Sequence, residues 1–85
     1  FYANWCGPCK RMTPELESFS GRNSDIEVLK VNIEDYNTLS SEFKIRAVPT
    51  LVFLKREDGL FVEKKRLSGF KKCAAIKEAF ESIKV

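Results

Sequence analysis

The chain has 85 residues, of which 44% are hydrophobic and 32% are charged, a composition typical of one small globular domain and not of a disordered chain. Its 15 Lys and Arg against 12 Asp and Glu give a formal charge of +3, too small and too dispersed to indicate a nucleic-acid-binding protein. No apolar run could span a bilayer and no cleavable signal opens the chain, so we expect neither membrane association nor secretion. Three cysteines cannot all pair within one chain, which favours a reducing compartment, and we therefore expect the cytoplasm.

The first predicted element is a strand that ends at residues 1–3, FYA, because these residues are apolar and aromatic. A helix should follow, since Met12, Leu16 and Phe19 recur at helical spacing. The same spacing places Cys9 on the buried face of that helix.

Residues with known positional preferences mark this helix. Pro8 suits its first turn, where a missing N–H leaves no bond unmade, and Gly21 is a suitable stop. Cys6 therefore lies just ahead of the helix N-terminus. Pro14 falls inside the helix, where it removes a backbone hydrogen bond and should kink the axis, and we expect its role to be structural.

Two hydrophobic strands are predicted in the middle of the chain. Residues 26–33, IEVLKVNI, are rich in aliphatic and β-branched side chains, as expected for a central strand covered on both faces. A short helix is expected over residues 37–43. The segment AVPTLVFL then supplies a second strand, entered through Pro49, where proline is tolerated.

The last part of the chain predicts a hairpin and a helix. Asp58-Gly59 is a turn signal, so the strand after Pro49 should pair antiparallel with residues 60–67. Ile76 and Phe80 mark the final helix, and Cys73 lies in phase with them, which favours a buried inert thiol over a regulatory one. The resulting order, β-α-β-α-β-β-α, predicts an α/β fold with a central mixed sheet flanked by helices.

The spacing of Cys6 and Cys9 is shared by zinc sites, redox couples and simple turns. A structural zinc site requires four Cys or His ligands, and the sequence offers no histidine and only Cys73 besides the pair, so we expect no metal. A redox couple needs a stabilised thiolate and a second thiol close enough to attack the mixed disulfide that the first one forms. A helix N-terminus supplies the stabilisation and the short spacing supplies the proximity, so redox chemistry is the favoured interpretation.

The motif WCGPCK, the proline in the helix that follows it and the AVPT turn together resemble the thioredoxin family. The similarity runs through FYANWCGPCKRMTPELESF and VLKVNIEDYNTLSSEFKIRAVPTLVFLK to a later Gly69, which is essentially the whole chain. The resemblance implies a thioredoxin-like fold and protein-disulfide reductase activity. It implies that Cys6 is the nucleophile that attacks a substrate disulfide and that Cys9 is the resolving thiol.

The resemblance also implies a substrate-binding surface around the pair. The matching residues are Trp5, Gly7, Pro8, Ala47, Val48, Pro49, Gly69 and Phe70. Pro49 matches a proline in the cis form opposite the motif, next to backbone that an extended substrate could pair with. A side chain at Gly69 would crowd the substrate, although a plain turn glycine is the alternative. Trp5 could instead be a core residue, because an aromatic at a strand end usually packs inward.

The Gly-Pro pair between the cysteines resembles the reducing members of the wider superfamily, in which a histidine in place of Pro8 marks oxidases and isomerases. The resemblance implies no bound cofactor and reducing equivalents from NADPH through thioredoxin reductase. The expected partners are that reductase and disulfide-containing proteins, with the chain a monomer that serves redox homeostasis. Two alternatives stay open: a binding or adaptor module of a larger protein, and a disulfide oxidase or isomerase.

Compared with the family, the sequence lacks the first strand, the first helix and the start of the central strand, so we expect residues 1–85 to be an N-terminally incomplete thioredoxin domain. The missing part includes the family's buried aspartate, which would precede Phe1 and accept the proton of the resolving thiol. Lys30, in the middle of an apolar strand, should either reach solvent or pair with a buried carboxylate. The resemblance names that aspartate as its partner and Lys30 as a supporting residue.

Overall fold

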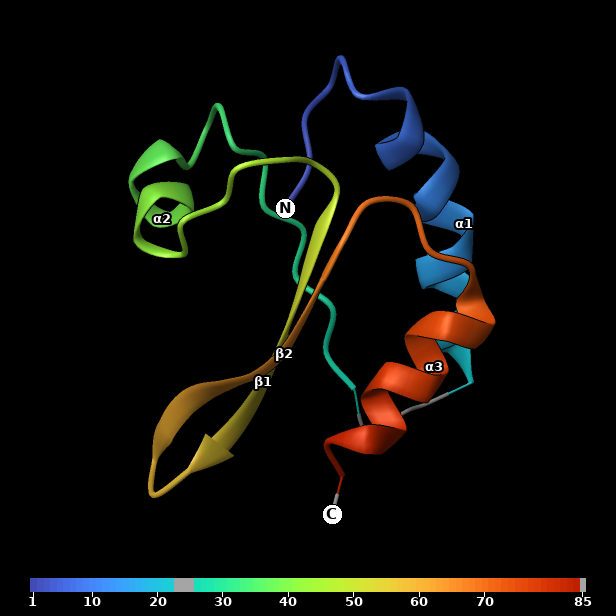
Figure 1. Ribbon diagram of the computed structural model, residues 1–85, viewed down its shortest axis with the longest axis vertical. Helices are drawn as coiled ribbons and strands as arrows, with labels where there is room; N and C mark the ends of the chain where they lie inside the picture. The colour runs from blue at the N-terminus through green and yellow to red at the C-terminus, as the bar shows by residue number, and fades with distance from the viewer. Residues whose placement is uncertain (23–25, 85) are drawn as a thin grey trace.

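The computed structural model describes residues 1–22 and 26–84. Its elements are helix α1 (Gly7–Gly21), helix α2 (Asn37–Glu42), strand β1 (Thr50–Glu57), strand β2 (Leu60–Ser68) and helix α3 (Cys73–Ser82). In Figure 1, α1 and α3 lie to the right of the β1–β2 hairpin and α2 lies to its left. The predicted helices and hairpin are confirmed, with bounds that differ by a few residues. None of the helices in this described part is long and apolar enough to cross a membrane.

The hairpin turns at Asp58 and Gly59, as predicted. Both residues have positive φ angles, 52° and 80°, which is the backbone pattern of a two-residue turn that matches the twist of antiparallel strands. The strands then pair antiparallel from Glu57 and Leu60 to Thr50 and Ser68, with one register shift between Phe53 and Leu54 that leaves Lys64 of β2 without a partner in the register. The hairpin is therefore the longest continuous ladder in the described chain.

The strands predicted at residues 1–3 and 26–33 are reduced to one parallel bridge between Tyr2 and Asn32. The backbone of Tyr2 forms two hydrogen bonds, each 2.9 Å long, to the residues on either side of Asn32. A strand is stable only where neighbouring backbone pairs with it, and in the described part of the chain the bridge joins residues 31–33 to Tyr2 alone. The prediction of a strand over the whole of residues 26–33 is therefore wrong in its length.

Phe1 also pairs with the start of β1. Its nitrogen donates to Thr50 O at 2.9 Å, and Thr50 N donates to Phe1 O at 3.2 Å, an exchange typical of antiparallel neighbours. Residues 1–2 thus lie between residues 31–33 and β1, parallel to the first and antiparallel to the second. The predicted mixed sheet exists as this narrow ladder together with the hairpin.

Helices α1 and α3 pack on each other through the apolar faces that their spacing predicted. Met12, Phe19 and Ile76 are at most 4% exposed and form one core cluster. Phe80 contacts Phe19 edge to face, with ring centroids 5.5 Å apart, an arrangement that aromatic pairs favour. This packing holds α1, and with it the N-terminus of α1, against the rest of the molecule.

Candidate active site

The WCGPC motif lies where α1 begins. Cys6 caps the helix with an extended backbone, φ −88° and ψ 107°, and its Sγ accepts a hydrogen bond from Cys9 N at 3.1 Å. Pro8 occupies the first turn, where its missing N–H leaves no bond unmade. The predicted placement of Cys6 ahead of the helix and of Cys9 on its buried face is confirmed.

Cys6 and Cys9 form a disulfide, with their Cα atoms 5.3 Å apart. Both residues are buried, at 4% and 6% exposure, and they pack with Ala3 in a small core cluster of their own. Within residues 1–22 and 26–84, no three His, Cys, Asp or Glu side chains gather as the ligands of a metal ion would. The arrangement is one that can open and close a disulfide.

The loop before β1 faces this disulfide. The peptide bond between Val48 and Pro49 is cis, which confirms the prediction. Cys6 Sγ lies 3.6 Å from Val48 O, close enough for a reduced Cys6 thiol to donate to that carbonyl. The loop therefore presents backbone groups directly beside the sulfur.

Hydrogen bonds from two neighbouring segments fix this loop. The buried hydroxyl of Thr50 donates to Ala47 O at 2.7 Å, and Gly69 N donates to Pro49 O at 2.8 Å. Thr50 was not predicted as a site residue, although its position directly after Pro49 in AVPT was the available signal. The second bond joins the segment after β2 to the loop, so residues far apart in the sequence form one surface.

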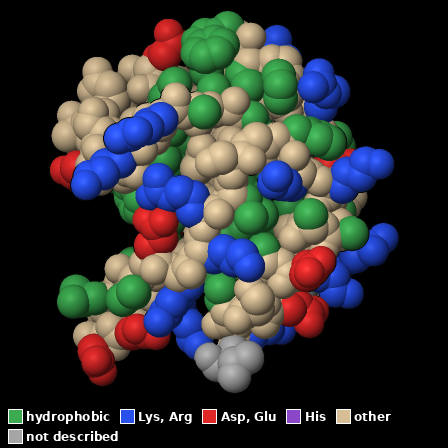
Figure 2. All heavy atoms as spheres, viewed as in Figure 1, with side chains coloured by type: hydrophobic (Ala, Val, Ile, Leu, Met, Phe, Trp, Pro, Cys, Tyr) green, Lys and Arg blue, Asp and Glu red, His purple; other side chains and the backbone are tan. Residues whose placement is uncertain are grey.

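Apolar residues lie at the surface around the pair. Trp5 is 68% exposed, which excludes the core alternative for it, and Phe70 is 37% exposed. Gly7 and Ala47 are exposed and Pro8 is half-buried. Figure 2 shows hydrophobic side chains at the end of the molecule that carries the loop before α1, with Lys and Arg side chains over α1 beside them. Two exposed aromatic side chains, Trp5 and Phe70, therefore lie at the surface near the buried disulfide.

Gly69 has a φ of 86°, a backbone conformation that disfavours any residue with a side chain. A Cβ atom placed there would meet no atom of the described chain within 4 Å. Backbone conformation, and not crowding inside the molecule, therefore explains the glycine. Clearance for a bound substrate stays a prediction.

A polar network behind Trp5 was not predicted from the sequence. Asn32 is only 5% exposed, its Nδ2 donates to Asn4 Oδ1 at 3.3 Å, and its Oδ1 accepts from Glu34 N at 2.9 Å. Buried amides need such partners, and here they tie the loop before the motif to the segment after the bridge. An asparagine between Val31 and Ile33, inside a predicted buried strand, was the signal that could have pointed to it.

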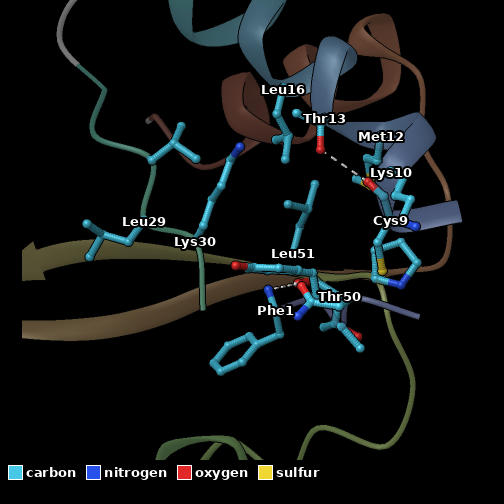
Figure 3. A pocket seen from close by; sticks show the side chains of 15 residues that line it. Phe1, Cys9, Lys10, Met12, Thr13, Leu16, Leu29, Lys30, Thr50 and Leu51 are labelled. Carbon is cyan, nitrogen blue, oxygen red and sulfur yellow. Dashed lines mark hydrogen bonds between the residues drawn. The ribbon is translucent and has the colours of Figure 1, made fainter. Parts of the chain in front are cut away.

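A pocket of about 210 Å³ opens behind the motif, between α1 and residues 28–30. Cys9, Leu16, Lys30 and Leu51 are among its lining residues, and Figure 3 shows Lys30 extending across it toward α1. Lys30 is exposed and forms no ion pair within the described chain. Exposure to solvent was the alternative expected for Lys30, and its pairing with an aspartate ahead of Phe1 stays a prediction.

Two further predicted residues lie away from the disulfide. Pro14 is inside α1 and exposed, and its structural role stays a prediction. Cys73 begins α3 and packs against the α1–α3 core, but it is half-buried and not fully buried as predicted, and the inertness of its thiol stays a prediction. Cys73 N donates to Glu15 Oε1 at 2.7 Å, which joins the start of α3 to α1.

Comparison with known proteins identifies relatives of this arrangement. Residues 1–82 match the family model named Thioredoxin. The chain is 42% identical over 65 residues to a thioredoxin of Mycoplasmoides gallisepticum, a match that covers 76% of this chain and 63% of the relative. It is 41% identical over 70 residues to a thioredoxin of Mycoplasma genitalium, covering 82% of this chain and 65% of the relative. The chain thus spans somewhat less than two thirds of the length of these relatives.

Solved structures give the same result for the fold. The structure of Trichomonas vaginalis thioredoxin superposes with a TM-score of 0.88 at 28% identity, over 99% of this chain and 75% of that one. Fasciola hepatica thioredoxin superposes with a TM-score of 0.84 at 30% identity, over 99% and 76%. The predicted α/β, thioredoxin-like fold is confirmed, and the chain belongs to the thioredoxin family.

Proposed function

We infer that the chain is a protein-disulfide reductase that works by dithiol–disulfide exchange. The observation that carries this proposal is the Cys6–Cys9 disulfide at the N-terminus of α1, with Cys6 Sγ 3.1 Å from Cys9 N and 3.6 Å from Val48 O. Backbone donors and the dipole at a helix N-terminus favour a negatively charged sulfur, which makes Cys6 the better thiolate of the two. The relatives named thioredoxin support the same chemistry.

The reaction begins from the reduced pair. The Cys6 thiolate attacks one sulfur of a substrate disulfide, the substrate S–S bond breaks, and the other substrate sulfur leaves as a thiolate that takes up a proton. Cys9, deprotonated, then attacks Cys6 Sγ in the mixed disulfide and displaces the second substrate thiolate. The Cys6–Cys9 disulfide forms, and two electrons have passed from the pair to the substrate.

The substrate segment binds in extended form along the cis-proline loop. The Val48 carbonyl beside Cys6 offers a β-type hydrogen bond to such a segment, and Gly69 leaves room next to it. Trp5 and Phe70 supply exposed apolar surface on either side of the motif. Apolar side chains around a backbone-pairing site suit many different protein substrates, since backbone groups are common to all of them.

Reduction, and not oxidation, is the proposed direction. Pro8 adds no positive charge between the cysteines, whereas a histidine there would favour the thiolate and make the disulfide more oxidising. NADPH supplies the electrons through thioredoxin reductase, and the chain acts as a monomer in the cytoplasm in redox homeostasis. No bound cofactor takes part in these steps.

Insulin reduction with NADPH and thioredoxin reductase tests this proposal. A reductase makes insulin precipitate and consumes NADPH in many turnovers, and the Cys73→Ser variant should do so at the same rate. A binding module would give no turnover, and an oxidase or isomerase would fail to consume NADPH in proportion to the insulin reduced. Either result, in a chain shown by circular dichroism to be folded, would overturn the proposed function.

A further inference from the structure

Arg11 is a cation close to the motif that takes no part in the exchange chemistry proposed above. Arg11 lies on the exposed face of α1, and its Cζ is 5.9 Å from the centre of the Phe70 ring, within the range of a cation–π contact. A Cβ atom placed on Gly7 would lie 3.7 Å from Arg11 Nη1. The guanidinium therefore sits between Gly7, which lies inside the motif, and Phe70, which lies at the surface.

Arg11 has no acidic partner within residues 1–22 and 26–84. The ion pairs of that part of the chain, Lys64 with Glu57 and Arg66 with Glu63, are both on the hairpin. Glu15 follows Arg11 by one helical turn, but its Oε1 accepts the hydrogen bond from Cys73 N at 2.7 Å. The guanidinium is thus positioned by an aromatic ring and keeps its hydrogen-bond donors for another molecule.

The neighbouring charges make this side of the site positive. Lys71 and Lys72 follow Phe70 directly in the sequence, and Figure 2 shows cationic side chains over α1 next to the hydrophobic end of the molecule. Of the acidic residues near the motif, Glu34 joins the Asn32–Asn4 network through its backbone N–H, and Glu15 has one carboxylate oxygen engaged by Cys73 N. A substrate chain that crosses the disulfide therefore meets positive charge on the Phe70 side.

We propose that Arg11 is a specificity-determining residue, which selects disulfide substrates with an Asp or Glu close to the attacked cysteine on the side that passes Phe70. This inference rests on the proposed reductase function. An arginine fork can hold a carboxylate by two parallel N–H···O bonds, and a guanidinium already stacked on a ring loses less freedom when it does so. Arg11 transfers no electron or proton; it strengthens binding of acidic segments before exchange.

The test uses two synthetic disulfide-bridged peptides that are identical except for Glu or Gln at positions two residues to each side of the attacked cysteine. The chain is reduced with dithiothreitol, freed of reductant and mixed with each peptide, and the second-order rate of peptide reduction is measured. We expect the Glu peptide to react roughly 3–10-fold faster at low salt, as an exposed charge pair of this kind allows. The preference should shrink in 0.5 M NaCl, where charges are screened over about 4 Å.

Arg11→Met should reduce both peptides at nearly the same rate, and Arg11→Lys should keep only part of the preference. Lys10→Met is the matched control, because Lys10 is the adjacent cation but lines the pocket behind the motif, and this variant should keep the full preference. Equal rates for the two peptides with the unmodified chain, or an unchanged preference in a folded Arg11→Met, would overturn the inference while the reductase function stood. Failure to reduce either peptide would overturn the reductase function and the inference with it.

Discussion

The regions on the two sides of the short ladder at Phe1 and Tyr2 differ in how closely they are packed and hydrogen-bonded. Toward the motif, Ala3 is 1% exposed and packs with both cysteines, and the cis-proline loop is tied down by hydrogen bonds from two segments. Away from the motif, Leu29 is 74% exposed and the pocket of about 210 Å³ separates residues 28–30 from α1. Among the described residues, the surroundings of the disulfide are therefore closely packed and hydrogen-bonded, whereas residues 28–30 face an open pocket.

A large gain in stability is expected from filling the pocket behind the motif. A chain extended ahead of Phe1 by the strand, helix and aspartate that the family resemblance implies should pair with the open backbone and occupy the pocket. We expect its Tm to rise by roughly 10 °C or more, which corresponds to about 2 kcal/mol in a domain of this size. Disulfide reduction should also become faster, because a carboxylate near Cys9 can accept its proton.

The effect of Lys30→Met on the Tm should differ between the 85-residue chain and the extended chain. In the 85-residue chain, Lys30 has no ion pair among the described residues, so this variant should leave the Tm almost unchanged. In the extended chain it should remove part of the gain, because it leaves a buried carboxylate without its partner. Equal melting temperatures and equal reduction rates for the short and extended chains would show that the open pocket costs nothing.

Truncation of a side chain should destabilise the protein in the packed α1–α3 core but not at the exposed residues 28–30. Ile76 is 1% exposed between α3 and α1, so Ile76→Ala should lower the free energy of unfolding by about 2–5 kcal/mol. Leu29→Ala, at an exposed position, should change it by less than about 0.5 kcal/mol. Urea denaturation of both variants measures the difference. A loss at Leu29 as large as that at Ile76 would mean that residues 28–30 are packed after all.

Substitution of two glycines should give effects of opposite sign. Gly69→Ala forces a side chain into a left-handed backbone conformation and should cost roughly 1–2 kcal/mol, loosening the hydrogen bond to Pro49. Gly21→Ala, at the end of α1 with open space around it, should be neutral or stabilising by up to about 1 kcal/mol. Thermal melts of both variants test this, and a Gly69→Ala as stable as the unmodified chain would contradict it.

The smallest effect is expected on the hairpin. Arg66 donates to both carboxylate oxygens of Glu63, at 2.8 and 2.9 Å, and this holds the pKa of Glu63 below its usual value. The contact therefore stabilises the fold above the unfolded carboxyl's titration range, and that stabilisation is lost as the pH falls through the lowered pKa. Since the pair is exposed, Glu63→Gln should change the Tm at pH 7 by only about 1–2 °C, and by less at pH 3. A larger effect at pH 3 than at pH 7 would reverse the sign of this interpretation.

The fold could be predicted wherever local chemistry decides it. Helical spacing gave α1 and α3, Asp58-Gly59 gave the turn of the hairpin, and the proline in the motif gave the start of α1. The strand at residues 26–33 could not be predicted in its true length from its own residues. Its apolar composition is that of a buried strand, but its pairing depends on the backbone beside it.

The site residues also differ in whether they could be predicted: those in a recognisable motif could be, and those that depend on distant neighbours could not. The spacing of Cys6 and Cys9 and the family resemblance placed the disulfide and the cis-proline, both confirmed. Asn32 and Arg11 were missed because an isolated asparagine or a surface arginine carries no pattern; each becomes notable only through a neighbour distant in sequence, Asn4 in one case and Phe70 in the other.

The division of roles between Cys6 and Cys9 can be tested by trapping. Cys9→Ser leaves Cys6 able to attack but removes the thiol that resolves the mixed disulfide, so the reduced variant mixed with insulin should accumulate as a covalent adduct on Cys6, seen by mass spectrometry without reductant. Cys6→Ser should form no such adduct, and Cys73→Ser in both backgrounds should leave the outcome unchanged. Capture of insulin by Cys6→Ser as efficient as capture by Cys9→Ser would contradict the assignment of Cys6 as the nucleophile.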